Sequence, residues 1–185
     1  MRIVGGSLRG RTLAAPKSRD VRPTSDRLRE SIFDILEHAY GRAVDGAAVV
    51  DLFAGTGALG LEALSRGAAR TLFVDDGVEA RALLRQNIET LGLGGVTRVF
   101  RRDATKLGAA PPDECFSLAF LDPPYDKGLA PLALRQLASG NWLTPGALVV
   151  VEEAASAEFD APEGYVAEEA RRYGDTQLVF LRRAP

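Results

Sequence analysis

Four consecutive residues, Asp122-Pro123-Pro124-Tyr125, could hold an amino group for chemistry. They follow residues 116–121, an apolar run that predicts a buried strand. The two prolines have no N–H to donate, so the backbone is stiff and offers only carbonyl oxygens beside the Asp122 carboxylate. This pair of acceptors suits an NH₂ group, because each acceptor takes one hydrogen and the nitrogen lone pair is aimed at an electrophile. Tyr125 then offers a flat face on which a base can stack.

A second stretch, residues 48–64, combines a predicted strand, a turn of small residues and a predicted helix. Its first part is apolar and rich in β-branched residues, as in a buried parallel strand, and leucines follow at helical spacing. Gly55 and Gly57 let the backbone turn sharply and approach a ligand, toward which the next helix points its free N–H groups. The stretch therefore predicts a nucleotide pocket.

The glycine turn is compatible with two kinds of cofactor. Gly55-x-Gly57-x-x-Gly60 matches the dinucleotide fingerprint, and Asp75 lies about 20 residues after the first glycine, where an acidic ribose-binding residue is expected. Asp51 ends the strand before the turn, and its charge would repel a pyrophosphate but attract a methionine ammonium group. The sequence thus favours S-adenosylmethionine over NAD. The alternative role of Asp51 is to bond only the amides of the turn.

The next predicted strands also end in carboxylates. One leads to Asp75 and Asp76, and the following one leads to Asp103 and Ala104. Because ligands of open α/β sheets bind at the carboxyl ends of the parallel strands, we expect Asp51, Asp75 and Asp103 along one ligand-binding edge. A ribose diol and an adenine amino group each need such an acceptor.

The remaining pattern predicts helices and strands that complete one sheet. Helices are expected at 78–91 and 129–137, a strand at 147–151, and a closing antiparallel pair at 165–171 and 177–181.

Before the first strand, residues 24–36 predict an amphipathic helix that Thr24, Ser25 or Asp26 can cap. The helix amides and Thr24 could hold the amino acid end of a cofactor. An ordinary capped helix with nothing bound is the alternative.

The N-terminal segment differs in charge from the rest of the chain. Residues 1–29 hold eight Arg or Lys and two Asp, a net charge of +6, whereas the remainder carries −8. Residues 1–4 and 12–14 predict a short hairpin with Arg9 and Arg11 near its tip. A basic arm on an acidic body favours a polyanionic partner, although a solvated capping hairpin is a serious alternative.

Length and composition exclude several classes of protein. A chain of 185 residues with 46% hydrophobic content suits one domain and leaves no room for a second of full size. The single cysteine, Cys115, excludes an internal disulfide framework and a cysteine-based zinc site. There is no apolar run near 20 residues and no pattern of a secretory leader. We expect a soluble cytoplasmic protein without a metal.

The motifs together resemble a known family. Asp51-Leu52-Phe53-Ala54-Gly55-Thr56-Gly57 with Asp122-Pro123-Pro124-Tyr125 is similar to class I amino-methyltransferases, which act on the nitrogen of bases or amides. Further blocks resemble the bacterial 16S rRNA guanine-N2 methyltransferases of the RsmD type: Met1-Arg2-Ile3-Val4-Gly5-Gly6, Arg9-Gly10-Arg11, Arg22-Pro23-Thr24-Ser25-Asp26-Arg27-Leu28-Arg29-Glu30, Gly60-Leu61-Glu62-Ala63-Leu64-Ser65-Arg66-Gly67-Ala68 and Tyr173-Gly174-Asp175-Thr176.

The resemblance implies a doubly wound, Rossmann-like α/β fold with a seven-stranded methyltransferase sheet. Residues 44–185 would form the methyltransferase domain, and residues 1–43 a basic hairpin and helix extension that contacts rRNA and covers the cofactor. S-adenosylmethionine would be the donor and a guanine amino group of 16S rRNA the acceptor, within a small-subunit particle. We expect a monomer.

The resemblance also assigns site residues by position. The methionine part of the cofactor would lie near Arg22, Thr24, Asp51, Phe53, Gly55 and Gly57, its ribose at Asp75 or Asp76, and its adenine at Asp103 and Ala104. Asp122, Pro123 and Tyr125 would hold the target base. The basic charge of the N-terminal segment, rather than the resemblance, predicts that Arg9, Arg11, Arg19 and Arg29 contact the rRNA.

Four other functions compete with this one. A DNA adenine N6-methyltransferase uses similar chemistry but normally carries an extra domain for reading sequence. A protein glutamine methyltransferase presents the same NH₂ group, and the basic N-terminal segment argues against it. Asp51 and the two prolines disfavour an NAD-dependent oxidoreductase. A non-catalytic rRNA-binding assembly factor would have lost the Asp122 motif.

Overall fold

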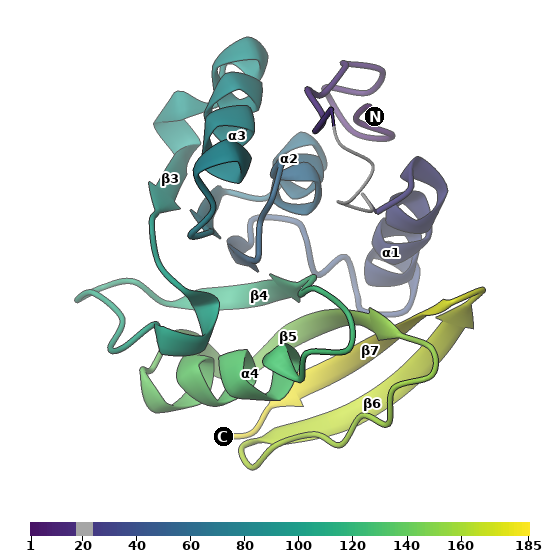
Figure 1. Ribbon diagram of the computed structural model, residues 1–185, viewed down its shortest axis with the longest axis vertical. Coiled ribbons are helices and arrows are strands. Elements are labelled where there is room, and N and C mark those ends of the chain that lie inside the picture. Colours follow the sequence, from purple (N-terminus) through teal and green to yellow (C-terminus); the bar gives the residue numbers. More distant parts are fainter. Residues whose placement is uncertain (18–23) are drawn as a thin grey trace.

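One sheet organises the chain, in the strand order β3-β2-β1-β4-β5-β7-β6 (Figure 1). The computed structural model describes residues 1–17 and 24–185. The strands are β1 Ala48–Leu52, β2 Arg70–Val74, β3 Thr97–Phe100, β4 Phe116–Leu121, β5 Leu143–Ala154, β6 Tyr165–Tyr173 and β7 Thr176–Arg183. The first five in this order are parallel, and β7 is antiparallel to both β5 and β6.

The order of the strands creates a switch point between β1 and β4. From β1 the chain moves outward to β2 and β3, and it then returns to place β4 on the other side of β1. Connections on the two sides of this point lead away from each other, which leaves a crevice at the carboxyl ends of β1 and β4. The predicted doubly wound, seven-stranded sheet is confirmed, and the strand order defines its ligand-binding edge.

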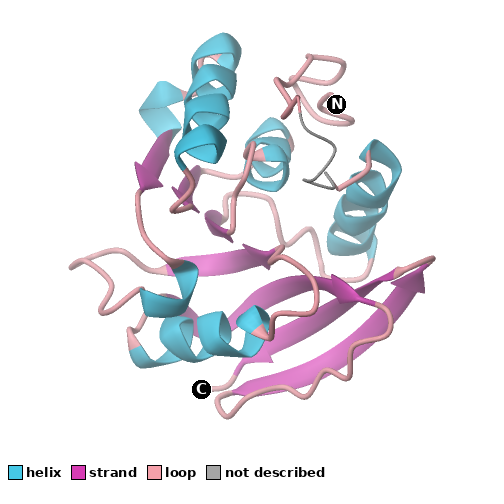
Figure 2. Cartoon of the chain, viewed as in Figure 1, coloured by secondary structure: helices cyan, strands magenta, loops and turns pink. Residues whose placement is uncertain are grey.

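Helices cover both faces of the sheet (Figures 1 and 2). The helices are α1 Asp26–His38, α2 Ala58–Ser65, α3 Val78–Leu91 and α4 Leu129–Ser139, with short 3₁₀ turns η1 Gly94–Val96 and η2 Ala104–Lys106. Alternate residues of each buried strand point to opposite faces. Thus Val49 packs with α1 and α2, whereas Val50 packs with α4.

The first helix is fixed by its cap and its apolar stripe. Ser25 is the N-cap and accepts a hydrogen bond from the Leu28 N–H, as one of the three predicted caps. Ile32 and Leu36 are buried against the sheet, while the opposite face is charged. This arrangement places Thr24, just before the cap, close to the switch point.

The N-terminal residues form a small hairpin, in which Arg2 and Thr12 make an isolated antiparallel bridge. Ile3 and Leu13 are buried with side chains of α2 and α3. The hairpin therefore packs on the helices rather than extending the sheet.

Strand β5 is longer than the predicted 147–151. It pairs with β4 on one side and with β7 on the other, and the β7 register continues through Glu152, Glu153 and Ala154. Beyond Val151 the pairing with β7 alone keeps the strand extended past the apolar run that the sequence pattern detects. This extension carries Glu152 to the edge of the crevice.

Among the helices in the described part of the chain, none has the length and apolar character that crossing a membrane requires.

Candidate active site

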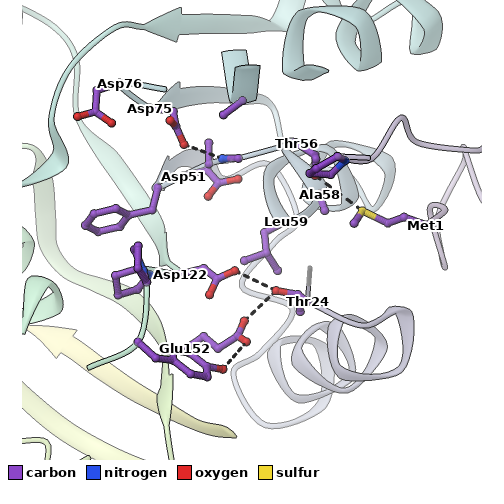
Figure 3. A pocket seen from close by; sticks show the side chains of 18 residues that line it. Met1, Thr24, Asp51, Thr56, Ala58, Leu59, Asp75, Asp76, Asp122 and Glu152 are labelled. Atoms are coloured by element: carbon purple, nitrogen blue, oxygen red, sulfur yellow. Dashed lines mark hydrogen bonds between the residues drawn. The ribbon is translucent and has the colours of Figure 1, made fainter. Parts of the chain in front are cut away.

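A cavity of about 520 Å³ occupies the switch point at the carboxyl ends of β1 and β4. The residues after β1 and β2 line one end, and those after β4 together with Thr24 and Glu152 line the other. Figure 3 shows Asp51, Asp75 and Asp76 on one side, while Asp122 and Glu152 both point toward Thr24. We refer to these as the glycine-turn end and the Asp122 end.

The glycine turn has the backbone shape that only a few residue types adopt easily. Gly55 has φ 57° and Gly57 has φ 82°, both in the left-handed region. Phe53, which also lines the cavity, has φ 56°, a rare value for a bulky residue and one often seen at functional sites. Gly57 faces away from the cavity, because a Cβ there would lie 2.3 Å from Leu84 Cδ1.

Asp51 is a buried carboxylate at the base of this turn. Its Oδ2 accepts a hydrogen bond of 3.0 Å from the Gly60 N–H in α2, and its side chain borders the cavity. Burial raises the pKa of Asp51 well above its usual value, although the Gly60 amide acts in the opposite direction. The predicted alternative was a bond to the amides of the turn; the amide that Asp51 bonds is instead in α2, and Asp51 also borders the cavity.

Asp75 and Asp76 lie at the rim of the glycine-turn end. Asp75 Oδ2 accepts from the Gly55 N–H at 2.9 Å, and its Oδ1 accepts from the Gly77 N–H at 2.8 Å. These bonds fix the Asp75 carboxylate, whereas Asp76 is exposed and borders the same cavity. The structure brings both candidates for the ribose to the cavity and anchors only Asp75 to the turn.

The Asp122 end is built from side chains that bond to one another. Thr24 Oγ1 lies 3.0 Å from Asp122 Oδ2 and 2.9 Å from Glu152 Oε2. Tyr125 donates its hydroxyl proton to Glu152 Oε1 at 3.0 Å, and its oxygen lies 2.8 Å from Thr176 Oγ1. Four distant segments of the chain are joined here by hydrogen bonds.

The two carboxyl groups at this end meet at one hydroxyl group. Thr24 has a single hydroxyl proton and its oxygen lies within hydrogen-bond distance of both carboxyls, so it can donate to only one of them at a time. Burial raises the pKa of Asp122 well above its usual value, and the neighbouring Glu152 charge raises it further. Burial also raises the pKa of Tyr125, so its hydroxyl stays a proton donor.

Two predicted adenine contacts lie away from the cavity. Asp103 caps η2, where its Oδ1 accepts from the Thr105 N–H at 2.8 Å and from the Thr105 hydroxyl at 2.7 Å. These bonds lower the pKa of Asp103. Ala104 is buried in the core cluster that includes α4. The structure does not bring these two residues to the cavity lining.

The prediction that Arg29 contacts rRNA is wrong. Its side chain is fully buried between α1 and α2, with Nε 3.4 Å from Glu62 Oε2 and Nη2 2.8 Å from Asp26 Oδ1. Glu62 also accepts from the Val4 and Gly5 N–H groups. Arg29 thus neutralises a buried carboxylate that holds the N-terminal hairpin, and it has no surface to offer a phosphate.

The other predicted arginines are on the hairpin or outside the described residues. Arg9 and Arg11 are exposed, and Arg11 donates to the Thr90 carbonyl at 2.9 Å, near the end of α3. The hairpin tip lies against the C-terminal end of α2, where the Ser7 N–H donates to the Ser65 carbonyl at 2.8 Å. It is therefore about one helix length from the cavity. Arg19 and Arg22 lie outside the described residues.

Sequence reasoning missed Glu152 and several lining residues from the N-terminal segment. Met1 and Pro16 border the cavity, as do Thr56 and Ala80. The signal for Glu152 was present, because it follows the apolar run of a parallel strand in the same way as Asp51 and Asp75 do. Met1 and Pro16 have no comparable sequence signal.

Within residues 1–17 and 24–185, the His, Cys, Asp and Glu side chains form no group of three that could hold a metal ion.

Comparison with known proteins decides the family. The model of the family described as "Conserved hypothetical protein 95" matches residues 1–182. The chain belongs to this family. A curated relative named "Putative rRNA methyltransferase YlbH", from Bacillus subtilis, is 34% identical over 99% of this chain and 99% of its own length. The "Ribosomal RNA small subunit methyltransferase D" of Escherichia coli is 38% identical over 82% of this chain and 74% of its own.

Solved structures agree with this placement in the Conserved hypothetical protein 95 family. A "Putative methyltransferase yhhF from Escherichia coli" has a TM-score of 0.84 and 32% identity, covering 100% of this chain and 98% of its own. An RNA methyltransferase from Salinibacter ruber in complex with S-adenosyl-L-homocysteine has a TM-score of 0.63 at 15% identity, over 88% of this chain and 94% of its own, which shows the shared fold. The resemblance to the RsmD type is confirmed.

Proposed function

We propose that this protein transfers a methyl group from S-adenosylmethionine to the N2 amine of a guanine in the 16S rRNA of the small ribosomal subunit. One observation carries the proposal: Asp122 and its two prolines lie in the same cavity as Asp51 and the glycine turn. A cofactor end and an amine-holding end therefore meet in one space. The names of the curated relatives support an rRNA substrate, and the guanine N2 position comes from the family resemblance.

The cavity residues fit S-adenosylmethionine. Its volume of about 520 Å³ lies within the range of small-molecule sites. The buried Asp51 carboxylate matches a positively charged amino group, since ionising this side chain without a cation is unfavourable. Asp75, fixed by two amides, and the exposed Asp76 offer acceptors for a ribose diol. When bound, the cofactor supplies an electrophilic methyl group.

At the Asp122 end, the chain's own groups orient the amine. The Asp122 carboxylate and the backbone carbonyls of the two prolines accept its two hydrogens, which directs the nitrogen lone pair toward the glycine-turn end. After transfer the methylated amine is acidic, and Asp122 Oδ1 or Oδ2 takes its proton and passes it to water. A strong base is not needed, because the main role of Asp122 is to orient the amine.

Glu152 and Thr24 position Asp122. Thr24 Oγ1 contacts both carboxyls, and the Tyr125 hydroxyl holds the other oxygen of Glu152. The ring of Tyr125 is consequently fixed at one edge of the cavity, with its face available to a base. A guanine that reaches this place must leave its stack in the RNA, so we expect an unpaired or easily opened site.

The experiment is to incubate the protein with a methyl-labelled donor and small subunits that lack the modification, and then to map the labelled nucleotide. We expect one guanine labelled on N2, and no label with the Asp122→Asn variant. Label on adenine N6 or on a protein glutamine would show that the acceptor is that group and not guanine N2. Absence of any label with the wild-type protein would leave an assembly factor as the better description.

A further inference from the structure

A second hollow borders the candidate active site at the Asp122 end. Its volume is about 460 Å³, and it lies between the first turns of α1 and the turn that joins β6 to β7. Thr24 and Glu152 line this hollow and also line the active-site cavity, so they form a wall between the two. Anything bound in the second hollow therefore lies beside the residues that position Asp122.

The second hollow combines an aromatic ring with a positive charge. Tyr173, at the end of β6, is 36% exposed and is one of only a few large exposed aromatic or aliphatic side chains in the described part of the chain. Arg27 stands exposed on the first turn of α1 at the same hollow. Nucleobases stack on aromatic rings whatever their identity, and arginine suits the geometry of phosphate. This pair of groups is typical of a nucleotide site.

The path of an RNA strand leads to the same place. When a base leaves its stack to reach Asp122, the nucleotides on either side of it must lie at the mouth of the active-site cavity. The hairpin arginines Arg9 and Arg11 lie near the C-terminal ends of α2 and α3 and do not line the active-site cavity. The wall formed by Thr24 and Glu152, in contrast, is shared by both hollows.

We propose that the second hollow binds the nucleotide next to the methylated guanine, with its base on Tyr173 and its phosphate at Arg27. This inference rests on the proposed function and names a further substrate subsite for it. Because stacking on a tyrosine does not read the base, the subsite adds affinity and holds the strand open without selecting a sequence. Recognition of the target base remains with the Asp122 end.

The test is to measure methylation kinetics on unmodified small subunits for Tyr173→Ala, Tyr173→Phe and Arg27→Ala. Loss of one stacked base predicts a KM for the subunit raised by about 5- to 150-fold in Tyr173→Ala. Tyr173→Phe keeps the ring and should stay within about twofold of wild type. Arg27→Ala should raise KM and reduce the salt dependence of KM, since it removes one phosphate contact.

The matched control is Arg135→Ala, which removes an exposed arginine from α4 on the opposite face of the sheet. It should leave KM unchanged, and the affinity for S-adenosylhomocysteine should be equal in all four variants. A wild-type KM in Tyr173→Ala, or a parallel loss of cofactor affinity, would overturn the subsite while leaving the proposed function intact. A wild-type enzyme that methylates no small subunit would overturn the proposed function itself.

Discussion

The two ends of the active-site cavity are held in different ways. At the glycine-turn end, carboxylates are anchored by backbone amides, as Asp51 is by Gly60 and Asp75 by Gly55 and Gly77. At the Asp122 end, side chains from distant segments hold one another, as Thr24 bonds both Asp122 and Glu152. The first end is fixed by local backbone shape, and the second depends on the assembled sheet.

This difference suggests a division of labour. A rigid backbone frame suits a cofactor that has the same shape in every reaction cycle. A network of hydrogen-bonded side chains can shift protons between its carboxyls, which suits the end where an amine loses one. If the two ends act separately, substitutions at one end should change cofactor binding and substitutions at the other should change turnover.

Asp122→Asn should have the largest effect, which is a loss of turnover. One acceptor oxygen becomes an NH₂ donor, so the target amine loses its orientation and its proton acceptor. We expect kcat to fall by about 10²- to 10⁴-fold, measured under saturating donor and substrate. Asp126→Asn is the matched control, because Asp126 is exposed on the same loop and lies outside the cavity lining. Near-normal turnover in Asp122→Asn would refute the acceptor pair.

Asp51→Asn should weaken cofactor binding and raise the free energy of unfolding. Loss of the charge facing the ammonium group should weaken S-adenosylhomocysteine binding by about 10- to 100-fold. The raised pKa of Asp51 means that the folded state binds its proton more tightly than the unfolded chain does. Wild type therefore loses stability as pH rises from the usual carboxyl range through this raised pKa, and the variant does not.

Thermal melting at two pH values measures this second effect. At pH 8, Asp51→Asn should melt at a higher temperature than wild type, with a free energy of unfolding that is larger by about 1 kcal/mol or more. At acidic pH the two proteins should melt at the same temperature. An affinity unchanged by the substitution would show that Asp51 serves only the turn.

The smallest effect is expected from Glu152→Gln, in the pH profile. Turnover should rise with pH as Asp122 ionises, because the carboxylate accepts hydrogen bonds more strongly than the acid does. The Glu152 charge raises the pKa of Asp122, so removing it should move this rising limb to lower pH. Plateau turnover should change by less than about tenfold, since glutamine can still bond Thr24 and Tyr125.

Glu153→Gln is the matched control for the pH profile. Glu153 is also buried, but its carboxylate accepts from the Ala154 N–H and it is not among the groups that shift Asp122. A rising limb that stays in place in Glu152→Gln, or that moves equally in the control, would contradict the coupling of the two carboxyls.

The sequence predicted the locally built end better than the assembled one. The positions of Asp51 and Gly55 follow from a strand, a glycine turn and a helix within one stretch, and Asp75 follows the next apolar run, so periodicity and turn chemistry suffice. Glu152 was missed because the predicted strand ended with the apolar run at Val151, whereas antiparallel pairing with β7 continues the strand through Glu152 to Ala154. No local pattern could show that Thr24 contacts Asp122 and Glu152, which lie 98 and 128 residues further along the chain.

Charge patterns were a weaker guide than apolar patterns. Arg29 belongs to a basic stretch, yet it is buried, where it pairs with Asp26 and shares the Glu62 carboxylate of α2 with Arg66. Asp103 lies three residues after the end of β3 rather than at it, and its carboxylate caps η2. Counting charges along the sequence cannot distinguish an exposed arginine from one buried in an ion pair, since burial depends on which segments pack over the side chain.

The most direct test of the central claim is calorimetric titration of S-adenosylhomocysteine into wild type and the Asp122→Asn variant. The two-ended cavity predicts one binding site per chain and dissociation constants that agree within about twofold, while turnover differs by orders of magnitude. A wild-type protein that binds no S-adenosylhomocysteine, or an Asp122→Asn variant whose affinity falls as far as that of Asp51→Asn, would contradict it.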